Sequence, residues 1–226
     1  RWAALPVSVP TILSREFSGR RVLLVEDNEV NRELAHEMLT SVGLVVDLAE
    51  NGLKACECVQ RTAYDLVLMD CHMPVMDGYA ATRRIREDLG MRQLPIIAMT
   101  ANALASDREH CLAIGMNDHI PKPIDVAALY ATLAHWLGQP DSPRTAPVLA
   151  EPAVKADIDI DAALTRLGGN RQMFNRLLTR FRENQGDVIS QLEADRQRGD
   201  SSAMILRAHT LRGLAGNLGA VKLSRL

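Results

Sequence analysis

Polar side chains stand directly behind the short apolar runs in the first half of the chain. They are two acidic residues after the first run, one after the third, a hydroxyl after the fourth and a lysine after the fifth: Glu26 and Asp27, Asp70, Thr100, and Lys122. Three carboxylates brought to one place repel each other, so they favour a cation among them or compensation by the lysine. Mg²⁺ prefers oxygen ligands and keeps several waters, which leaves room for a phosphate oxygen. These residue types indicate phosphoryl chemistry at a magnesium site.

Asp70 is the candidate nucleophile, because it lies centrally among these positions and a carboxylate can accept a phosphoryl group as an acyl phosphate. In that role Thr100 would donate a hydrogen bond to one phosphoryl oxygen, and Lys122 would neutralise another as a point charge. A lone aspartate after a strand is usually a turn or helix-capping residue. The prediction therefore depends on all of these positions occurring together.

The elements that must bring these residues together are apolar runs that alternate with amphipathic stretches. The runs predict strands at 22–25, 44–48, 66–69, 96–99 and near 119–120. Helical spacing occurs at 29–42, 53–60, 78–89, 104–114 and 126–137. Strict alternation of this kind predicts a five-stranded parallel sheet with helices on both faces, a doubly wound, flavodoxin-like α/β fold. Ligands of such sheets bind beyond the carboxyl ends of the strands, where the polar residues lie.

This α/β region resembles a two-component receiver domain over its whole length. The segments that carry the resemblance are 26–28, 69–78, 99–103 and 122–124, in this order along the chain. The resemblance implies that Asp70 is the residue that is phosphorylated. It also implies that Mg²⁺ is held by Asp27, Asp70 and the backbone carbonyl of His72, with Glu26 acting through water.

One position departs from the commonest pattern of the family. His119 stands three residues before Lys122, where similar domains often carry a tyrosine or phenylalanine that turns inward on phosphorylation. We therefore expect onward transfer of the phosphoryl group, more than a large surface rearrangement, as the response to phosphorylation. The resemblance further implies a cis peptide bond between Lys122 and Pro123, which would aim the lysine ammonium.

A second candidate residue lies in a segment of helical spacing over 200–218. One face of this helix is expected to be apolar and to pack in a core, with Met204, Ala208, Leu211, Ala215 and Leu218. His209 lies on the opposite face with Arg212, Gly213 and Gly216, and we expect it to be exposed. The two glycines weaken the helix by about 1 kcal/mol each, a cost that makes sense if another backbone or site comes close. An exposed imidazole is substantially neutral at cytosolic pH and can attack phosphorus, and Arg212 adds positive charge beside it.

The run 209–220 resembles the signature of histidine-containing phosphotransfer (HPt) domains, which implies that His209 is phosphorylated. The fold of that family is a four-helix bundle. Few residues follow Gly219, so we expect an all-α domain that is truncated at its C-terminus, an incomplete bundle. Its apolar face would then need further residues or a partner chain, which leaves self-association open.

Composition divides the chain into four parts. Residues 1–20 carry two prolines and a glycine without a sustained period, which predicts an N-terminal linker. Residues 21–138 form the receiver region, and 139–157 contain four prolines among alanine and serine, which predicts an extended linker. Residues 158–226 form the HPt region. The glycines that predict helix breaks in it are Gly168, Gly169, Gly199 and Gly219.

The overall composition excludes several function classes. The 226 residues are 47% hydrophobic and 24% charged, with 26 basic against 28 acidic side chains, so no global positive field attracts nucleic acid or an anionic membrane. No apolar run approaches the roughly 18 to 20 residues of a membrane span, and no signal peptide is evident. We expect a cytoplasmic location, with a membrane anchor elsewhere in the parent protein left open. The four cysteines are expected to be reduced thiols.

The resemblances to a receiver domain and to an HPt domain together imply phosphorelay signal transduction. A phosphohistidine of a sensor kinase would phosphorylate Asp70 with Mg²⁺, and the group would move onward to or from His209. The order of receiver, linker and HPt region resembles the C-terminal part of a hybrid sensor histidine kinase, whose kinase core is not in these residues. The expected partners are a sensor histidine kinase domain in cis or in trans, an HPt domain and a downstream response regulator.

Two alternatives from other classes stay open. A magnesium-dependent phosphohydrolase would also use a strand-end aspartate and a lysine, but it needs a second acid two residues after the nucleophile, where this chain has His72. A response regulator with a DNA-binding output needs a clustered basic recognition helix. The region 158–226 is only mildly basic, and its charges are not clustered.

Overall fold

Five strands form one parallel sheet in the order β2-β1-β3-β4-β5. Their bounds are β1 (Arg21–Val25), β2 (Val45–Ala49), β3 (Leu66–Asp70), β4 (Ile96–Thr100) and β5 (Asp118–Pro121). The structure, a computed structural model, describes residues 17–100, 105–138, 158–220 and 223. The strand order, with β1 between β2 and β3, is that of a doubly wound, flavodoxin-like sheet, so the predicted fold class is confirmed.

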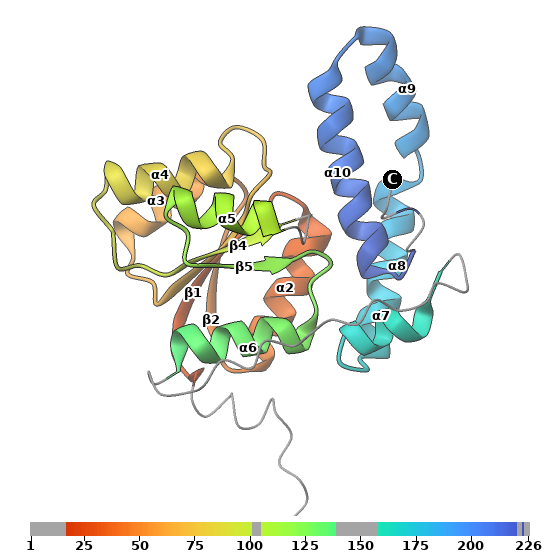
Figure 1. Cartoon of the computed structure of the whole chain (residues 1–226). Helices are drawn as coiled ribbons and strands as arrows, with labels where there is room; N and C mark the ends of the chain where they lie inside the picture. The colour runs from red at the N-terminus through yellow and green to blue at the C-terminus, as the bar shows by residue number, and fades with distance from the viewer. Residues whose placement is uncertain (1–16, 101–104, 139–157, 221–222, 224–226) are drawn as a thin grey trace, which may run out of the picture.

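Helices cover both faces of this sheet (Figure 1). The helices on one face are α2 (Glu29–Ser41) and α6 (Val126–Leu137), and those on the other are α3 (Gly52–Arg61), α4 (Gly78–Glu87) and α5 (Ala105–Ile114). Alternate side chains of β1 enter the two cores, because successive residues of a strand point to opposite faces. Leu24 packs in the core with Leu34 of α2, and Leu23 packs in the core with Ile85 of α4.

The strand register places the predicted polar residues on one rim. Val25 is paired with Met69, so the residues that follow these two positions lie level at the carboxyl ends of β1 and β3. Thr100, the last residue of β4, is paired with Pro121 of β5. Helix α2 begins at Glu29, soon after β1 ends at Val25. Asn28 and Asp77 cap α2 and α4, each accepting a hydrogen bond from a backbone N–H in the first turn.

Phe17 corrects the prediction that residues 1–20 are only a linker. Its side chain is completely buried in the core under α2 and α6, although residues 1–16 lie outside the described part of the chain. Arg20 and Gly19 bond to the main chain around it, Arg20 N–H to Phe17 O and Gly19 N–H to Gly43 O. A single aromatic residue without periodic neighbours gives no helix or strand signal, so the sequence pattern could not identify it as core.

Replacing Phe17 by alanine should lower the free energy of unfolding by about 3 kcal/mol, because the substitution removes a buried aromatic side chain and leaves a cavity. Urea-induced unfolding of the whole chain measures this loss. Leu112→Ala is the matched control, since Leu112 is 37% exposed and should cost much less. Equal losses for the two variants would contradict the burial of Phe17.

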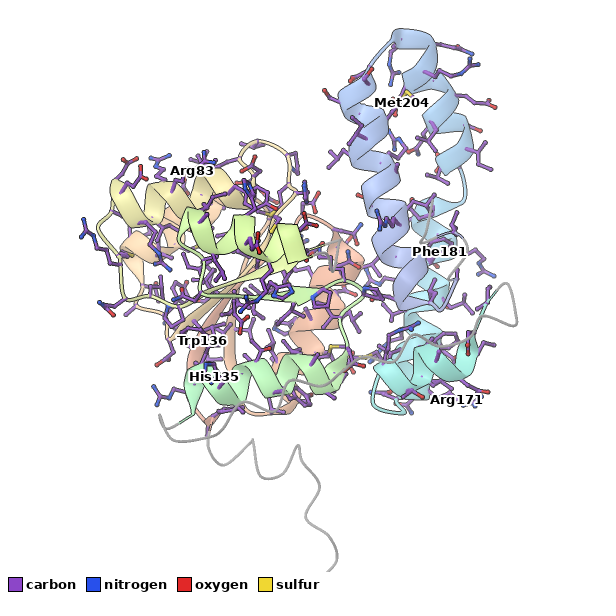
Figure 2. All side chains as sticks on the ribbon, in the orientation of Figure 1. Arg83, His135, Trp136, Arg171, Phe181 and Met204 are labelled. Carbon is purple, nitrogen blue, oxygen red and sulfur yellow. The ribbon has the colours of Figure 1, made fainter. Side chains whose placement is uncertain are left out.

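The C-terminal region is helical, as predicted. The helices among its described residues are α7 (Ile160–Arg166), α8 (Arg171–Gln185), α9 (Val188–Arg198) and α10 (Ser201–Asn217). The predicted glycine breaks after α7, after α9 and after α10 are confirmed, and a further break at Gly186 was not predicted. α9 and α10 form a hairpin that projects away from the sheet (Figure 1), with Met204 near its tip (Figure 2). Arg207 of α10 donates to Asp195 of α9 at 2.8 Å and so joins the two helices.

The predicted apolar face of α10 is partly wrong. Ala208 is exposed, whereas Leu214, which was not assigned to that face, is buried. The reason is that α10 changes neighbours along its length: α9 lies beside it, and α2 and α7 also contact it. The expectation that its glycines admit a close neighbour is confirmed. A Cβ atom on Gly216 would lie 3.2 Å from the ring of Pro123, and one on Gly213 would lie 3.6 Å from Asn31 Nδ2.

The apolar face of the helical region is covered in part by the receiver region. Leu177 and Leu214 belong to the same buried cluster as Leu34 and Leu129 of the α2 and α6 face. We expected this face to need further residues or a partner chain, and the structure shows that residues of the same chain also contribute. All four cysteines are free thiols, as expected.

Candidate functional site

Three carboxylates meet at the carboxyl rim of the sheet. Glu26 and Asp27 follow β1, Asp70 ends β3, and one oxygen from each lies within 4.8 Å of the others. Glu26 and Asp70 are both 1% exposed, whereas Asp27 is half-buried and opens the cluster toward solvent. The predicted convergence of these three side chains, from positions 44 residues apart in sequence, is confirmed.

Lys122 lies between two of these carboxylates. Its Nζ atom is 2.7 Å from Glu26 Oε2 and 2.7 Å from Asp70 Oδ2, and its side chain is only 6% exposed. The backbone N–H of Lys122 donates to Thr100 O at 2.6 Å, which fixes the loop after β5 against the end of β4. The expected cis peptide bond between Lys122 and Pro123 is present.

The charges of this cluster do not balance. Burial raises the pKa of Glu26 and of Asp70, with Lys122 opposing the rise in both, and burial together with the Glu26 charge raises the pKa of Asp27. Burial would lower the pKa of Lys122, but the Glu26 and Asp70 carboxylates raise it above its ordinary value. Three carboxylates share one ammonium group, so a divalent cation would relieve the excess negative charge. Oxygen donors in this number suit Mg²⁺.

The other predicted site residues lie around this cluster. Thr100 is buried at the end of β4, on the strand next to β3. His72 is exposed, and its backbone N–H donates to Asp70 Oδ1 at 3.2 Å, so its peptide lies beside the carboxylate. His119 is half-buried in β5, with Nδ1 3.8 Å from Asp118 Oδ1.

Two residues of the site were missed by the sequence analysis. Asn31 of α2 donates from Nδ2 to Glu26 Oε1 at 3.1 Å, and its own Oδ1 accepts from Nδ2 of Asn217 on α10 at 3.0 Å. Both asparagines are buried. A signal existed for Asn31, which interrupts the apolar face of α2 beside Leu34, because a polar residue at a core position needs a hydrogen-bonding partner. No local signal exists for Asn217, since its partner is 186 residues away.

α10 lies against the carboxylate cluster. A narrow cleft is lined by the residues of the cluster and by two residues of this helix, which are Glu26, Asp27, Asn28, Asn31, Asp70 and Lys122 with Thr210 and Gly213. His209 belongs to α10 and directly precedes Thr210. Its side chain lies outside the described part of the structure, so its exposure stays a prediction. The predicted supporting residue Gly213 therefore borders the site. Arg212 is half-buried on the same helix.

Comparisons with known proteins agree with this arrangement. The family described as response regulator receiver domain matches residues 22–134, half of the chain, and the Hpt domain family matches residues 176–226. The receiver domain of the sensor histidine kinase PA1611 of Pseudomonas aeruginosa is 49% identical, with a TM-score of 0.50 over 54% of this chain and 100% of that one. Its structure has a magnesium ion coordinated in the active-site cleft.

Two further relatives extend the comparison. The sensor protein GacS of Pseudomonas syringae is 32% identical over 96% of this chain, which covers 25% of that protein. The complex of the Saccharomyces cerevisiae phosphotransfer protein Ypd1 with the receiver domain of Ssk1 matches at 28% identity, with a TM-score of 0.51 over 53% of this chain and 90% of the matched one. GacS and the other histidine kinases to which this chain is similar are much longer proteins. The chain covers a quarter or less of their length.

The fold and the acidic rim thus define a doubly wound receiver module. The chain belongs to the response regulator receiver family and carries an Hpt domain behind the receiver. This pair of domains supports phosphorelay signal transduction as its function, in place of the phosphohydrolase and DNA-binding alternatives. Within the described residues no helix is long and apolar enough to cross a bilayer.

Proposed function

We propose that Asp70 accepts a phosphoryl group from a sensor-kinase phosphohistidine and that the group is exchanged with His209. The observation that carries this proposal is the position of Asp70, a buried carboxylate within 4.8 Å of two others and 2.7 Å from the Lys122 ammonium. A structural aspartate at a strand end needs neither neighbour. A phosphoacceptor uses both, because the phosphoryl oxygens bring further negative charge into the cleft, which the ammonium and a cation held by the carboxylates would offset.

Asp27, Asp70 and the backbone carbonyl of His72 would hold Mg²⁺, with Glu26 acting through water. The crowding of the three carboxylates and their raised pKa values support a cation there. When bound, Mg²⁺ supplies positive charge that stabilises the phosphoryl oxygens during transfer.

The residues of the chain itself perform the transfer. An Asp70 carboxylate oxygen attacks phosphorus, the P–N bond of the phosphohistidine breaks, and its electron pair returns to the imidazole nitrogen of the donor. Lys122 would turn its ammonium from the free carboxylate to a phosphoryl oxygen, and the Thr100 hydroxyl would donate to another. In the second transfer Asp70 is the donor. A His209 ring nitrogen attacks the phosphorus of the acyl phosphate, and the Asp70 carboxylate leaves with the electron pair of the broken P–O bond.

The helical domain supports the second transfer. Thr210 and Gly213 line the cleft that contains Asp70, so α10 reaches the acceptor side of the sheet. Gly213 leaves room on this helix because it has no side chain, and Arg212 would add positive charge for the phosphoryl group. The parent protein is proposed to be a cytoplasmic or membrane-anchored hybrid histidine kinase, with its kinase domain as donor and a downstream response regulator as the further partner.

Labelling with radioactive acetyl phosphate in Mg²⁺ tests the two carriers. In the whole chain, label should appear on Asp70, where it is stable to acid and labile to base, and then on His209, where these stabilities are reversed. Asp70→Asn should take up less than about one hundredth of the label, because the nucleophile is gone. His209→Gln should retain only the base-labile label.

Asp77→Asn is the matched control for Asp70→Asn. Asp77 is exposed and caps α4, and asparagine caps a helix equally well, so labelling should be unchanged. Base-labile label that persists in Asp70→Asn would refute the assignment of the acceptor. Acid-labile label that persists in His209→Gln would refute the assignment of the second carrier.

A further inference from the structure

Outside the phosphoryl site, α2 of the receiver and α8 of the Hpt domain pair through opposite charges. Glu29, Glu33 and Glu37 follow one another at intervals of four on an exposed face of α2, and we call them the acidic row. Arg176 and Arg180 have the same interval on α8. The two helices lie side by side near the base of the helical region (Figure 1).

The ion pairs have a fixed register. Arg176 Nη2 lies 2.5 Å from both carboxylate oxygens of Glu37. Arg180 is 2.9 Å from Glu33 and 3.6 Å from Glu29. The later arginine of α8 pairs with the earlier glutamates of α2, so the two helices run antiparallel. Arg176 meets the last glutamate of the acidic row, and Arg180 meets the first two.

A second contact fixes the end of α10 on the same surface. Asn217 donates to Asn31, which lies in α2 between the first two members of the acidic row, and this bond is buried. Gly216 allows the ring of Pro123 to approach, because a Cβ atom there would be only 3.2 Å away. The charged contact and the buried contact lie on different Hpt helices, so together they determine both position and rotation.

The buried contact continues into the phosphoryl site. Asn31 donates to Glu26, and the other oxygen of Glu26 accepts from Lys122, which also contacts Asp70. The ion pairs of the acidic row are therefore formed in the same arrangement of the two domains in which α10 lines the cleft that contains Asp70.

We propose that the acidic row is the docking surface for α8 of the same chain, so that this receiver exchanges phosphoryl groups with its own Hpt domain in preference to another copy. This inference rests on the proposed function. The side chains of the row are 42% to 62% exposed, so the ion pairs add little stability. Exposed charge pairs act on the rate and specificity of association, because an Hpt domain without matching positive charge leaves the row uncompensated. Another copy of this chain carries the same arginines, so the preference for the same chain comes from the covalent connection, which raises the local concentration of α8.

The test uses the whole chain, labelled on Asp70 by acetyl phosphate, and follows transfer to His209. The double reversal Arg176→Glu/Arg180→Glu should slow this transfer by about tenfold or more, because it places five acidic groups together. Adding Glu33→Arg and Glu37→Arg should restore most of the rate, since the charges are then exchanged. The control Arg171→Glu/Arg182→Glu makes the same change of net charge on α8, at exposed positions without an ion pair among the described residues, and should transfer normally.

A mixture separates transfer within one chain from transfer between copies. One partner carries His209→Gln and the other carries Asp70→Asn, so phosphoryl transfer can occur only between chains. The unmutated chain should transfer faster than this mixture, at a rate independent of protein concentration.

Equal rates for the mixture and the unmutated chain would overturn the preference for the same chain. An unchanged rate in the Arg176→Glu/Arg180→Glu variant, or no recovery on charge exchange, would overturn the role of the acidic row. Failure of the proposed function looks different, because no label would then reach Asp70 in any of these proteins.

Discussion

Replacing Lys122 by methionine should slow labelling of Asp70 by acetyl phosphate at least about a hundredfold, the loss typical when one charge-stabilising donor is removed. The same change should lower the free energy of unfolding in the absence of Mg²⁺ by about 3 to 5 kcal/mol. Both effects have one origin: Glu26 and Asp70 are buried, and Lys122 is 2.7 Å from each. Mg²⁺ should recover part of the lost stability, since it brings positive charge to the same carboxylates, but it should not restore the labelling rate.

Lys54→Met provides the control for this prediction. Lys54 is exposed and forms a 3.5 Å ion pair with Glu57, so its loss should change stability by about 1 kcal/mol or less and leave labelling intact. Labelling rates and urea unfolding, each with and without Mg²⁺, measure the four quantities. If Lys122→Met and Lys54→Met behave alike, the ammonium does not compensate the acidic rim.

Asp27→Asn should move function and stability in opposite directions. Removal of Mg²⁺ by a chelator should slow labelling of the unmutated chain by about a hundredfold. Asp27→Asn should require at least about tenfold more Mg²⁺ for half-maximal labelling, because a candidate ligand becomes neutral. Without Mg²⁺ the variant should be more stable than the unmutated chain, because burial and the neighbouring Glu26 charge both raise the pKa of Asp27 and so disfavour its charged form.

Magnesium titrations of labelling rate and of thermal unfolding check both parts. Asp77→Asn again serves as the control, and neither quantity should change in it. A variant that loses stability without Mg²⁺, or that keeps its magnesium requirement, would show that Asp27 is a structural residue.

The residues at the rim of the sheet were predictable because the signal for each of them lies in a few neighbouring residues of the sequence. Each strand is a short apolar run, and the residue that ends or follows it must lie at the carboxyl end of a parallel strand. Asp27, Asp70 and Thr100 could be placed in this way without coordinates. The double pairing of Lys122 could not, because it depends on the direction of a long side chain and on which carboxylates remain nearest once the loop has closed.

The contacts between the receiver and the Hpt domain were not predictable from the sequence. Nothing near Asn217 indicates that its amide meets Asn31, and helical periodicity alone assigned Ala208 to the core and omitted Leu214. Periodicity identifies one buried face, whereas α10 is contacted by several helices along its length. The glycines at 213 and 216 were informative because a missing side chain implies a close neighbour, although the identity of that neighbour came only from the structure.

The two outer strands of the sheet limit how molecules of this protein can associate. β5 has four residues and ends at Pro121, which has no N–H to offer a further strand. On the opposite border, β2 has five residues and includes Asp47, whose carboxylate meets Arg21 of the neighbouring strand at 3.7 Å. Short borders with a charge or a proline resist the addition of a foreign strand and so discourage open-ended β-assemblies. Contacts between molecules are therefore disfavoured at the two sheet borders, which leaves the helical and loop surfaces of the described residues for association.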